Sequence, residues 1–82
     1  MANALNILCF GPAREATGES KLRFTTEVPC SVAQLRQRLA EHYPKLGSTE
    51  HIRIAVDQEY ADDALTIAGH EEIAIILPVS GG

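Results

Sequence analysis

The sequence has few aromatic residues, and it lacks Trp altogether, with two Phe and two Tyr in 82 residues. Aliphatic side chains must therefore form most of the core. A chain of this length forms one domain, here residues 1–82, and buries only a little over half of the surface that its unfolded form exposes. We expect a thin aliphatic core.

Basic residues are also in the minority, with seven Lys and Arg against eleven Asp and Glu and a net charge of −4. No basic block is present, which argues against nucleic acid as a partner. Apolar runs are far shorter than the about 20 residues that span a bilayer, so we expect no membrane helix. The start, Met1 to Ala4, lacks the basic and apolar segments of a secretory signal, and a cytoplasmic location is expected.

Metal-binding and catalytic motifs are missing as well. Cys9 and Cys30 match no metal-ligand spacing, and we expect both to be reduced thiols, with Cys9 a small core residue. His42, His51 and His70 are scattered singly and are expected on the surface. With no phosphate loop and no nucleophile beside a base, the chain is not expected to be an enzyme on its own.

What is present is a regular alternation of apolar and polar residues near the N-terminus. Residues 5–10 predict an apolar strand, and Gly11-Pro12 begins a polar stretch to Gly18 with room for one helical turn. Residues 21–28 alternate strictly and predict a half-buried strand. The side chains on its apolar face are Leu22, Phe24, Thr26 and Val28.

Helical periodicity follows. Ser31 and Gln34 form a capping-box pattern that predicts a helix start, and Pro44 prevents continuation. The spacing predicts one amphipathic helix over about 32–43. Its apolar positions are Val32, Leu35, Leu39 and Tyr43.

The second half of the chain predicts further strands. Residues 52–56 alternate, a turn at Asp57-Gln58 leads to a brief pairing around Tyr60, and residues 73–77 form a last strand that is apolar on both faces. Strands apolar on both faces belong in the middle of a sheet, so the first and last strands are placed there and the second and third at the edges. The predicted fold is α+β, a mixed sheet with one main helix on one face, the ubiquitin-like β-grasp.

One helix covers only one face of such a sheet. By strand parity, the side chains facing the helix are Ile7, Cys9, Ile73 and Ile75, and those on the opposite face are Leu8, Phe10 and Ile76, with Tyr60 beside them. Exposed apolar clusters usually mark a partner surface. Loops covering this face, or self-pairing of the domain, remain alternatives.

The C-terminal segment 78–82 reads Pro78, Val79, Ser80, Gly81 and Gly82. Fully extended, its last four residues span about 13 Å, enough to enter a deep active site on another protein. Glycines lack a Cβ and can pass a narrow channel, although such an end could also be slack. A terminal carboxylate is an anion at neutral pH and a poor electrophile, so activation, such as adenylation by ATP followed by sulfur transfer, must come from outside.

These residues resemble a known family. Residues 76–82, Ile-Leu-Pro-Val-Ser-Gly-Gly, with the preceding residues 69–74, resemble the ending of molybdopterin synthase small subunits. The Arg14-Glu15 pair, the helix and residues 55–60 extend the resemblance over nearly the whole chain. The departures are Leu77 for a proline, His70 for Asp, Asp57 for Asn and Ile75-Ile76 for aromatics. They bear on partner specificity more than on the chemistry.

The resemblance implies a sulfur carrier in molybdenum cofactor biosynthesis. An ubiquitin-activating-like adenylyltransferase would use ATP to adenylate Gly82, and a sulfur donor protein would convert it to a thiocarboxylate. Inserted into the large synthase subunit, which would hold the catalytic residues, the tail would pass sulfur to cyclic pyranopterin monophosphate. The resemblance implies a heterotetramer, no permanently bound cofactor, and a contact surface for the large subunit. That surface comprises Phe10, Tyr60 and Ile76, to which parity adds Leu8.

Three alternatives remain open from the sequence. The chain could carry sulfur for thiamin synthesis or tRNA thiolation, or it could be a ubiquitin-like protein modifier. In a different class, it could be a passive β-grasp adaptor whose binding does not depend on Gly81 and Gly82.

Overall fold

The computed structural model describes residues 1–77, and the elements follow one another closely along this part of the chain. In order they are β1 (Ala2–Cys9), α1 (Pro12–Thr17), β2 (Lys21–Glu27), β3 (Cys30–Ser31), α2 (Val32–His42), the 3-10 turns η1 (Pro44–Leu46) and η2 (Thr49–His51), β4 (Arg53–Val56), β5 (Glu59–Tyr60), β6 (Thr66–Ile67) and β7 (Ile73–Ile76).

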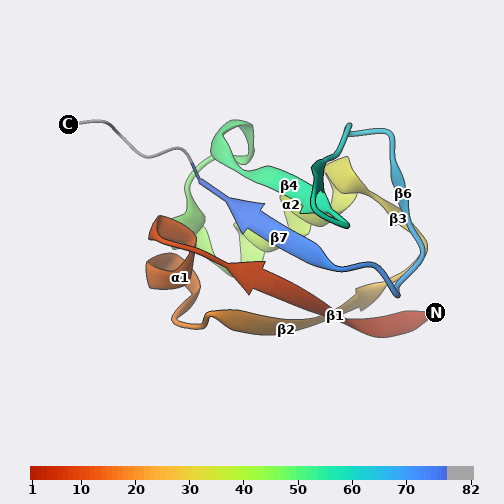
Figure 1. Ribbon diagram of the computed structural model, residues 1–82, viewed down its shortest axis with the longest axis horizontal. Coiled ribbons are helices and arrows are strands. Elements are labelled where there is room, and N and C mark those ends of the chain that lie inside the picture. Colours follow the sequence, from red (N-terminus) through yellow and green to blue (C-terminus); the bar gives the residue numbers. More distant parts are fainter. Residues whose placement is uncertain (78–82) are drawn as a thin grey trace.

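Five strands form a mixed sheet in the order β2-β1-β7-β4-β5, and β3 pairs with β6 in a separate two-stranded sheet. The central pair, β1 and β7, is parallel, while the other neighbours are antiparallel. Helix α2 packs behind the sheet and covers one face, as Figure 1 shows. The arrangement is the predicted ubiquitin-like β-grasp.

The prediction that the third strand lies at an edge is wrong. β4 has β7 on one side and β5 on the other, so the two-residue β5 is the edge strand instead. The alternation of apolar and polar residues in β4 shows that only one of its faces packs on the core. A strand can have one buried face at any position in a sheet, so the alternation does not indicate an edge. The prediction that β2 is an edge strand, and that β1 and β7 are central, is confirmed.

Several element boundaries differ from those predicted. β1 begins at Ala2 and ends at Cys9, because residues 2–4 pair with residues 25–27 of β2, and Phe10 lies beyond the strand. No sequence pattern predicted the β3–β6 pair, whose strands have two residues each.

The start of α2 satisfies its first backbone amides completely. The predicted capping box is confirmed: the Gln34 N–H donates to the Ser31 hydroxyl, and the Ser31 N–H donates to the Gln34 side chain. The N–H groups of Val32 and Ala33 donate to carbonyls of Leu65 and Asp63. Helix N-termini leave such donors unpaired unless other groups accept. The segment 63–65 is thus fastened to the helix.

The core lies between α2 and one face of the sheet. Its fully buried side chains include those predicted by parity to face the helix, and all four are at most 1% exposed. These are Ile7, Cys9, Ile73 and Ile75. Leu35 and Leu39 of α2 pack against them from the helix side. The aliphatic core predicted from composition is confirmed, with Phe24 its one buried aromatic residue.

Two local structures fix the course of β7 and its neighbour. Asp57 and Gln58 both have positive φ, 50° and 72°, as a type I′ hairpin turn requires. The Asp57 side chain also accepts a hydrogen bond from the Glu72 N–H. Just before β7, the Glu71 carboxylate accepts hydrogen bonds from the N–H groups of residues 68, 69 and 70. Both carboxylates hold the loop from which β7 begins.

The first prediction concerns the hairpin turn. Gln58→Gly removes the strain of a side chain at φ 72°, and we expect the free energy of unfolding to rise by about 0.5 to 1 kcal/mol, net of the larger chain entropy of glycine. Urea unfolding measures this change. The matched control, Gln37→Gly in the middle of α2, should lower stability by about 1 kcal/mol. Equal losses for both variants would contradict the prediction.

The second prediction concerns pH. Burial raises the pKa of Glu71, but the backbone hydrogen bonds from Ala68 and Gly69 outweigh it, so the pKa lies below its ordinary value. A carboxyl group whose pKa is lowered by folding stabilises the protein at pH values above its unfolded-state pKa. This stabilisation is lost as the pH falls through the folded-state pKa. Glu71→Gln should therefore unfold at lower urea than the parent chain at pH 7, and the gap should close as the pH falls through the lowered folded-state pKa of Glu71. Glu50→Gln serves as control, and a gap that persists at low pH would refute the account.

Candidate functional site

The face of the sheet turned away from α2 carries one continuous row of side chains. Strand register aligns them across all five strands of the sheet: Lys21, Leu8, Ala74, Ala55 and Tyr60. In the next row, Arg53 is paired with Ile76. Because side chains alternate between faces along a strand, these residues share the face that the helix leaves uncovered.

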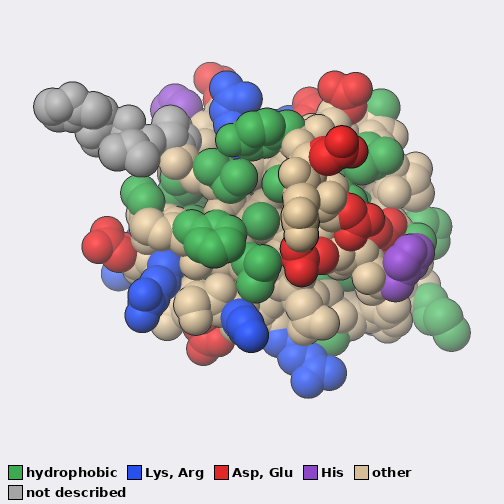
Figure 2. All heavy atoms as spheres, viewed as in Figure 1, with side chains coloured by type: hydrophobic (Ala, Val, Ile, Leu, Met, Phe, Trp, Pro, Cys, Tyr) green, Lys and Arg blue, Asp and Glu red, His purple; other side chains and the backbone are tan. Residues whose placement is uncertain are grey.

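Four apolar residues on this face form what we call the apolar patch: Leu8, Phe10, Tyr60 and Ile76. Phe10 is 58% exposed and Tyr60 67% exposed, and they are two of the four large apolar side chains that are exposed within residues 1–77. Leu8 and Ile76 are half-buried. Figure 2 shows hydrophobic side chains gathered on this face of the molecule. The parity prediction is confirmed for Leu8 and Ile76, which the strand register places on the uncovered face, while Phe10 lies just beyond β1 and is exposed.

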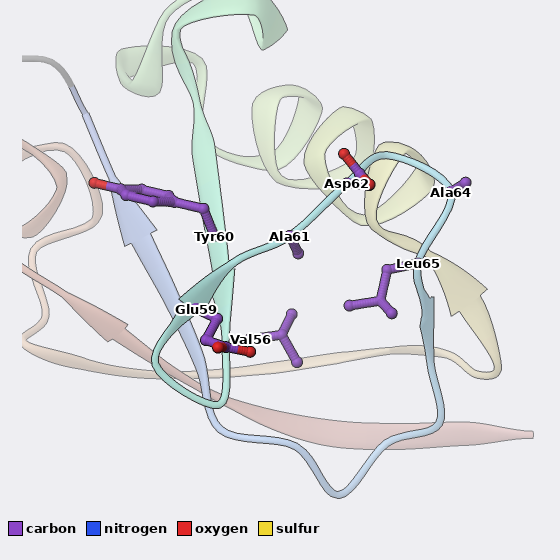
Figure 3. A pocket seen from close by; sticks show the side chains of 7 residues that line it. All are labelled: Val56, Glu59, Tyr60, Ala61, Asp62, Ala64 and Leu65. Atoms are coloured by element: carbon purple, nitrogen blue, oxygen red, sulfur yellow. The ribbon is translucent and has the colours of Figure 1, made fainter.

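Tyr60 is held at the margin of the patch by a neighbouring cation. The guanidinium carbon of Arg53 lies 6.0 Å from the centre of the Tyr60 ring, within the range of a cation–π contact. Figure 3 shows the Tyr60 side chain extending away from the other labelled side chains. The aromatic ring is therefore presented outward from β5 with its orientation supported.

The patch lies where the C-terminal segment begins. Since β1 and β7 are parallel and Cys9 pairs with Ile75, the next residues, Phe10 and Ile76, come at the same end of the sheet. Leu77 packs against the core and anchors this end. The tail residues predicted to act, Pro78, Val79, Ser80, Gly81 and Gly82, lie outside the described residues.

Two hollows border the patch that the sequence did not reveal. One, of about 450 Å³, lies beside Tyr60 and is shown in Figure 3; its lining includes Val56, Glu59, Asp62 and Leu65. The second, of about 480 Å³, lies beside Leu8 and is lined by Asn6, Ile7, Leu8, Lys21, Leu22, Arg23 and Glu72. The first hollow is formed within one segment, residues 56–65, and the sequence analysis missed it. The second joins residues 6–8, 21–23 and 72, which are distant in sequence, so no local pattern predicts it.

The described residues offer little for catalysis. Cys9 and Cys30 are free and buried, and burial raises the pKa of each thiol, which disfavours the nucleophilic thiolate. In residues 1–77 no group of three or more His, Cys, Asp or Glu is placed to hold a metal ion. Over the same residues, no helix has the length and apolar character needed to cross a membrane. The main feature of this part of the chain is the exposed apolar patch.

Comparison with solved structures agrees with the fold. Small archaeal modifier protein 1 from Haloferax volcanii superimposes with a TM-score of 0.76 at 21% identity, covering 94% of this chain and 99% of that protein. At this identity the likeness concerns the fold alone.

Comparison of sequences goes further. A molybdopterin synthase sulfur carrier subunit from Dictyostelium discoideum is 36% identical over 86 aligned residues, covering all of both chains. One from Arabidopsis thaliana is 35% identical over 82 residues, covering 95% of this chain and 82% of the relative. The model of the ThiS family matches residues 7–82. With a match along nearly its whole length and relatives similar from end to end, the chain belongs to the ThiS family.

Proposed function

We propose that this chain is the sulfur carrier subunit of a molybdopterin synthase and that the carboxyl group of Gly82 carries the sulfur. The observation that carries the proposal is the position of the apolar patch at the end of the sheet from which the C-terminal segment continues. A partner that covers the patch would have that segment at the margin of the contact. The names of the curated relatives support the same role.

The chain supplies a substrate group and a docking surface, and its partners supply the catalysis. Its two thiols are buried with raised pKa, so neither suits an attack on an acyl group. A carboxylate is itself unreactive toward nucleophiles until an oxygen is converted to a leaving group. The proposed division of labour places the catalytic residues on the large subunit.

The proposed chemistry has three balanced steps. A Gly82 carboxylate oxygen attacks the α-phosphorus of ATP on an activating adenylyltransferase, which releases pyrophosphate and leaves an acyl adenylate. A sulfur donor protein attacks the acyl carbon through a persulfide and displaces AMP. A second thiol then reduces the acyl disulfide, which leaves the thiocarboxylate and a disulfide on the donor side. ATP is thus consumed by the activating enzyme and is not held by this chain.

In the synthase, the tail would enter the large subunit and its sulfur would pass to cyclic pyranopterin monophosphate. The thiocarboxylate sulfur would attack a side-chain carbon of the pyranopterin and displace an oxygen substituent, so that a C–S bond replaces a C–O bond. Water would then attack the acyl carbon and cleave the acyl–sulfur bond, which leaves the sulfur on the pyranopterin and restores the Gly82 carboxylate. The apolar patch would supply the affinity, since large, exposed aromatic side chains such as Phe10 and Tyr60 are common binding hot spots. Leu8 and Ile76 would fill the space between them.

The third prediction tests the carrier chemistry by intact-protein mass. Incubation of the full chain with ATP, a sulfur source and the activating enzyme of the same organism should raise its mass by the replacement of one oxygen by sulfur. Deletion of Gly82 should abolish the shift. If the full chain stays unchanged while a known carrier reacts with its own enzyme, the sulfur-carrier function is wrong. Isopeptide conjugates to lysines would instead indicate a protein modifier.

The fourth prediction tests the patch. Tyr60→Asp and Phe10→Asp should each weaken binding to the large subunit by about 30-fold or more, as expected for loss of about 2 kcal/mol at a hot spot. Calorimetric titration measures the affinity, and circular dichroism checks that the variants are folded. Leu65→Asp is the matched control, because Leu65 is 43% exposed but lies outside the patch. Equal loss in the control would remove the patch from the interface.

A further inference from the structure

Part of the sheet face turned away from α2 carries positive charge, although the whole chain is negatively charged. The protein has a net charge of −4, yet the first two outward positions of β2 are basic: Lys21 is paired with Leu8 and Arg23 with Asn6. Figure 2 shows Lys and Arg side chains along the side of the face where β2 runs in Figure 1. The edge of the face next to Leu8 is therefore basic.

Lys21 and Arg23 are close enough to act on one group. They are two residues apart on the same strand, so their side chains leave the same face about 7 Å apart. Both line the second hollow, of about 480 Å³, together with Leu8 and Glu72. Two cations thus face one carboxylate in this hollow. Leu8 belongs to the hollow and to the apolar patch, which makes the two surfaces continuous.

Two arginines of the chain are used internally, whereas Lys21 and Arg23 are available. Arg36 forms an ion pair with Asp63 at 2.7 Å, and Arg38 donates to the Thr26 hydroxyl and the Glu27 carbonyl at 3.0 Å. Within the described part of the chain, neither Lys21 nor Arg23 takes part in an ion pair. Both side chains are exposed and can reach a partner.

We propose that Lys21 and Arg23 form a basic subsite that binds carboxylate side chains of the large subunit, next to the apolar contact at Leu8. The inference rests on the proposed function and adds the chemistry of the partner: an apolar surface bordered by Asp or Glu on the side that meets β2. Arg binds carboxylates through two parallel hydrogen bonds, which fixes orientation as well as affinity. Complementary charges at the rim mainly raise the association rate and select the partner.

A competing account gives these residues a purely protective role. β2 is an exposed edge strand, and charged side chains on such edges prevent pairing with other chains. Charge of either sign on the edge would serve that role. Partner binding would then not depend on whether residues 21 and 23 are positive or negative. The salt dependence and sign dependence of association therefore separate the two accounts.

The experiment measures the association rate of the full chain with the purified large subunit of the same organism, by stopped-flow fluorescence, from about 0.05 to 0.5 M salt. Arg23→Glu should slow association about tenfold at low salt, and the effect should shrink at high salt as charges are screened. Lys21→Glu should act in the same direction. Arg23→Lys should stay within about twofold of the parent chain.

Lys45→Glu is the matched control, because it makes the same charge change on η1, after α2 and off the sheet. It should leave the rate within about twofold of the parent. Equal rates for Arg23→Glu and Lys45→Glu at every salt concentration would overturn the basic subsite. So would a doubled mass of the free chain in light scattering that is lost in Arg23→Glu, since the occupant would then be a second copy.

Failure of this inference can be told from failure of the proposed function. If the parent chain binds the large subunit and forms the thiocarboxylate while Arg23→Glu associates normally, only the basic subsite is wrong. If the parent chain does not bind the large subunit at all, both are wrong.

Discussion

The rest of the structure depends on the parallel pairing of β1 with β7 at the centre of the sheet. It joins the first and last strands of the described chain, with Ile7 beside Ile73 and Cys9 beside Ile75. Parallel pairs cannot be closed by a tight turn, so every other element is part of the crossover between them. Because both strands run in the same direction, the residues that follow them come to one end of the sheet.

This pairing also accounts for the uncovered face of the sheet. Two central strands apolar on both sides need two covers, and α2 supplies one. On the other side, the small side chains of Ala55 and Ala74 lie in the middle of the face, and the large, exposed side chains of Phe10 and Tyr60 lie at its margins. Exposure of aromatic surface to water is unfavourable, and burying that surface against another protein would lower the free energy. Phe10 and Tyr60 therefore remain exposed where α2 provides no cover.

The same architecture anchors the residues that precede the C-terminal segment. Leu77 packs on the core, and Glu71 and Asp57 hold the start of β7 through backbone hydrogen bonds. The last described residues are therefore tied to the most buried strand of the protein.

The sequence by itself determined the local features: the capping box at Ser31, the helix it starts, the turn at Asp57-Gln58 and the faces of β1 and β7. Each is set by residues within a few positions of one another, where backbone sterics and side-chain period decide. Tertiary structure alone decided that β5 rather than β4 is the second edge strand, that β3 pairs with β6, and that Lys21 lines a hollow. These depend on contacts between segments far apart in the chain, whose pairing no local pattern encodes.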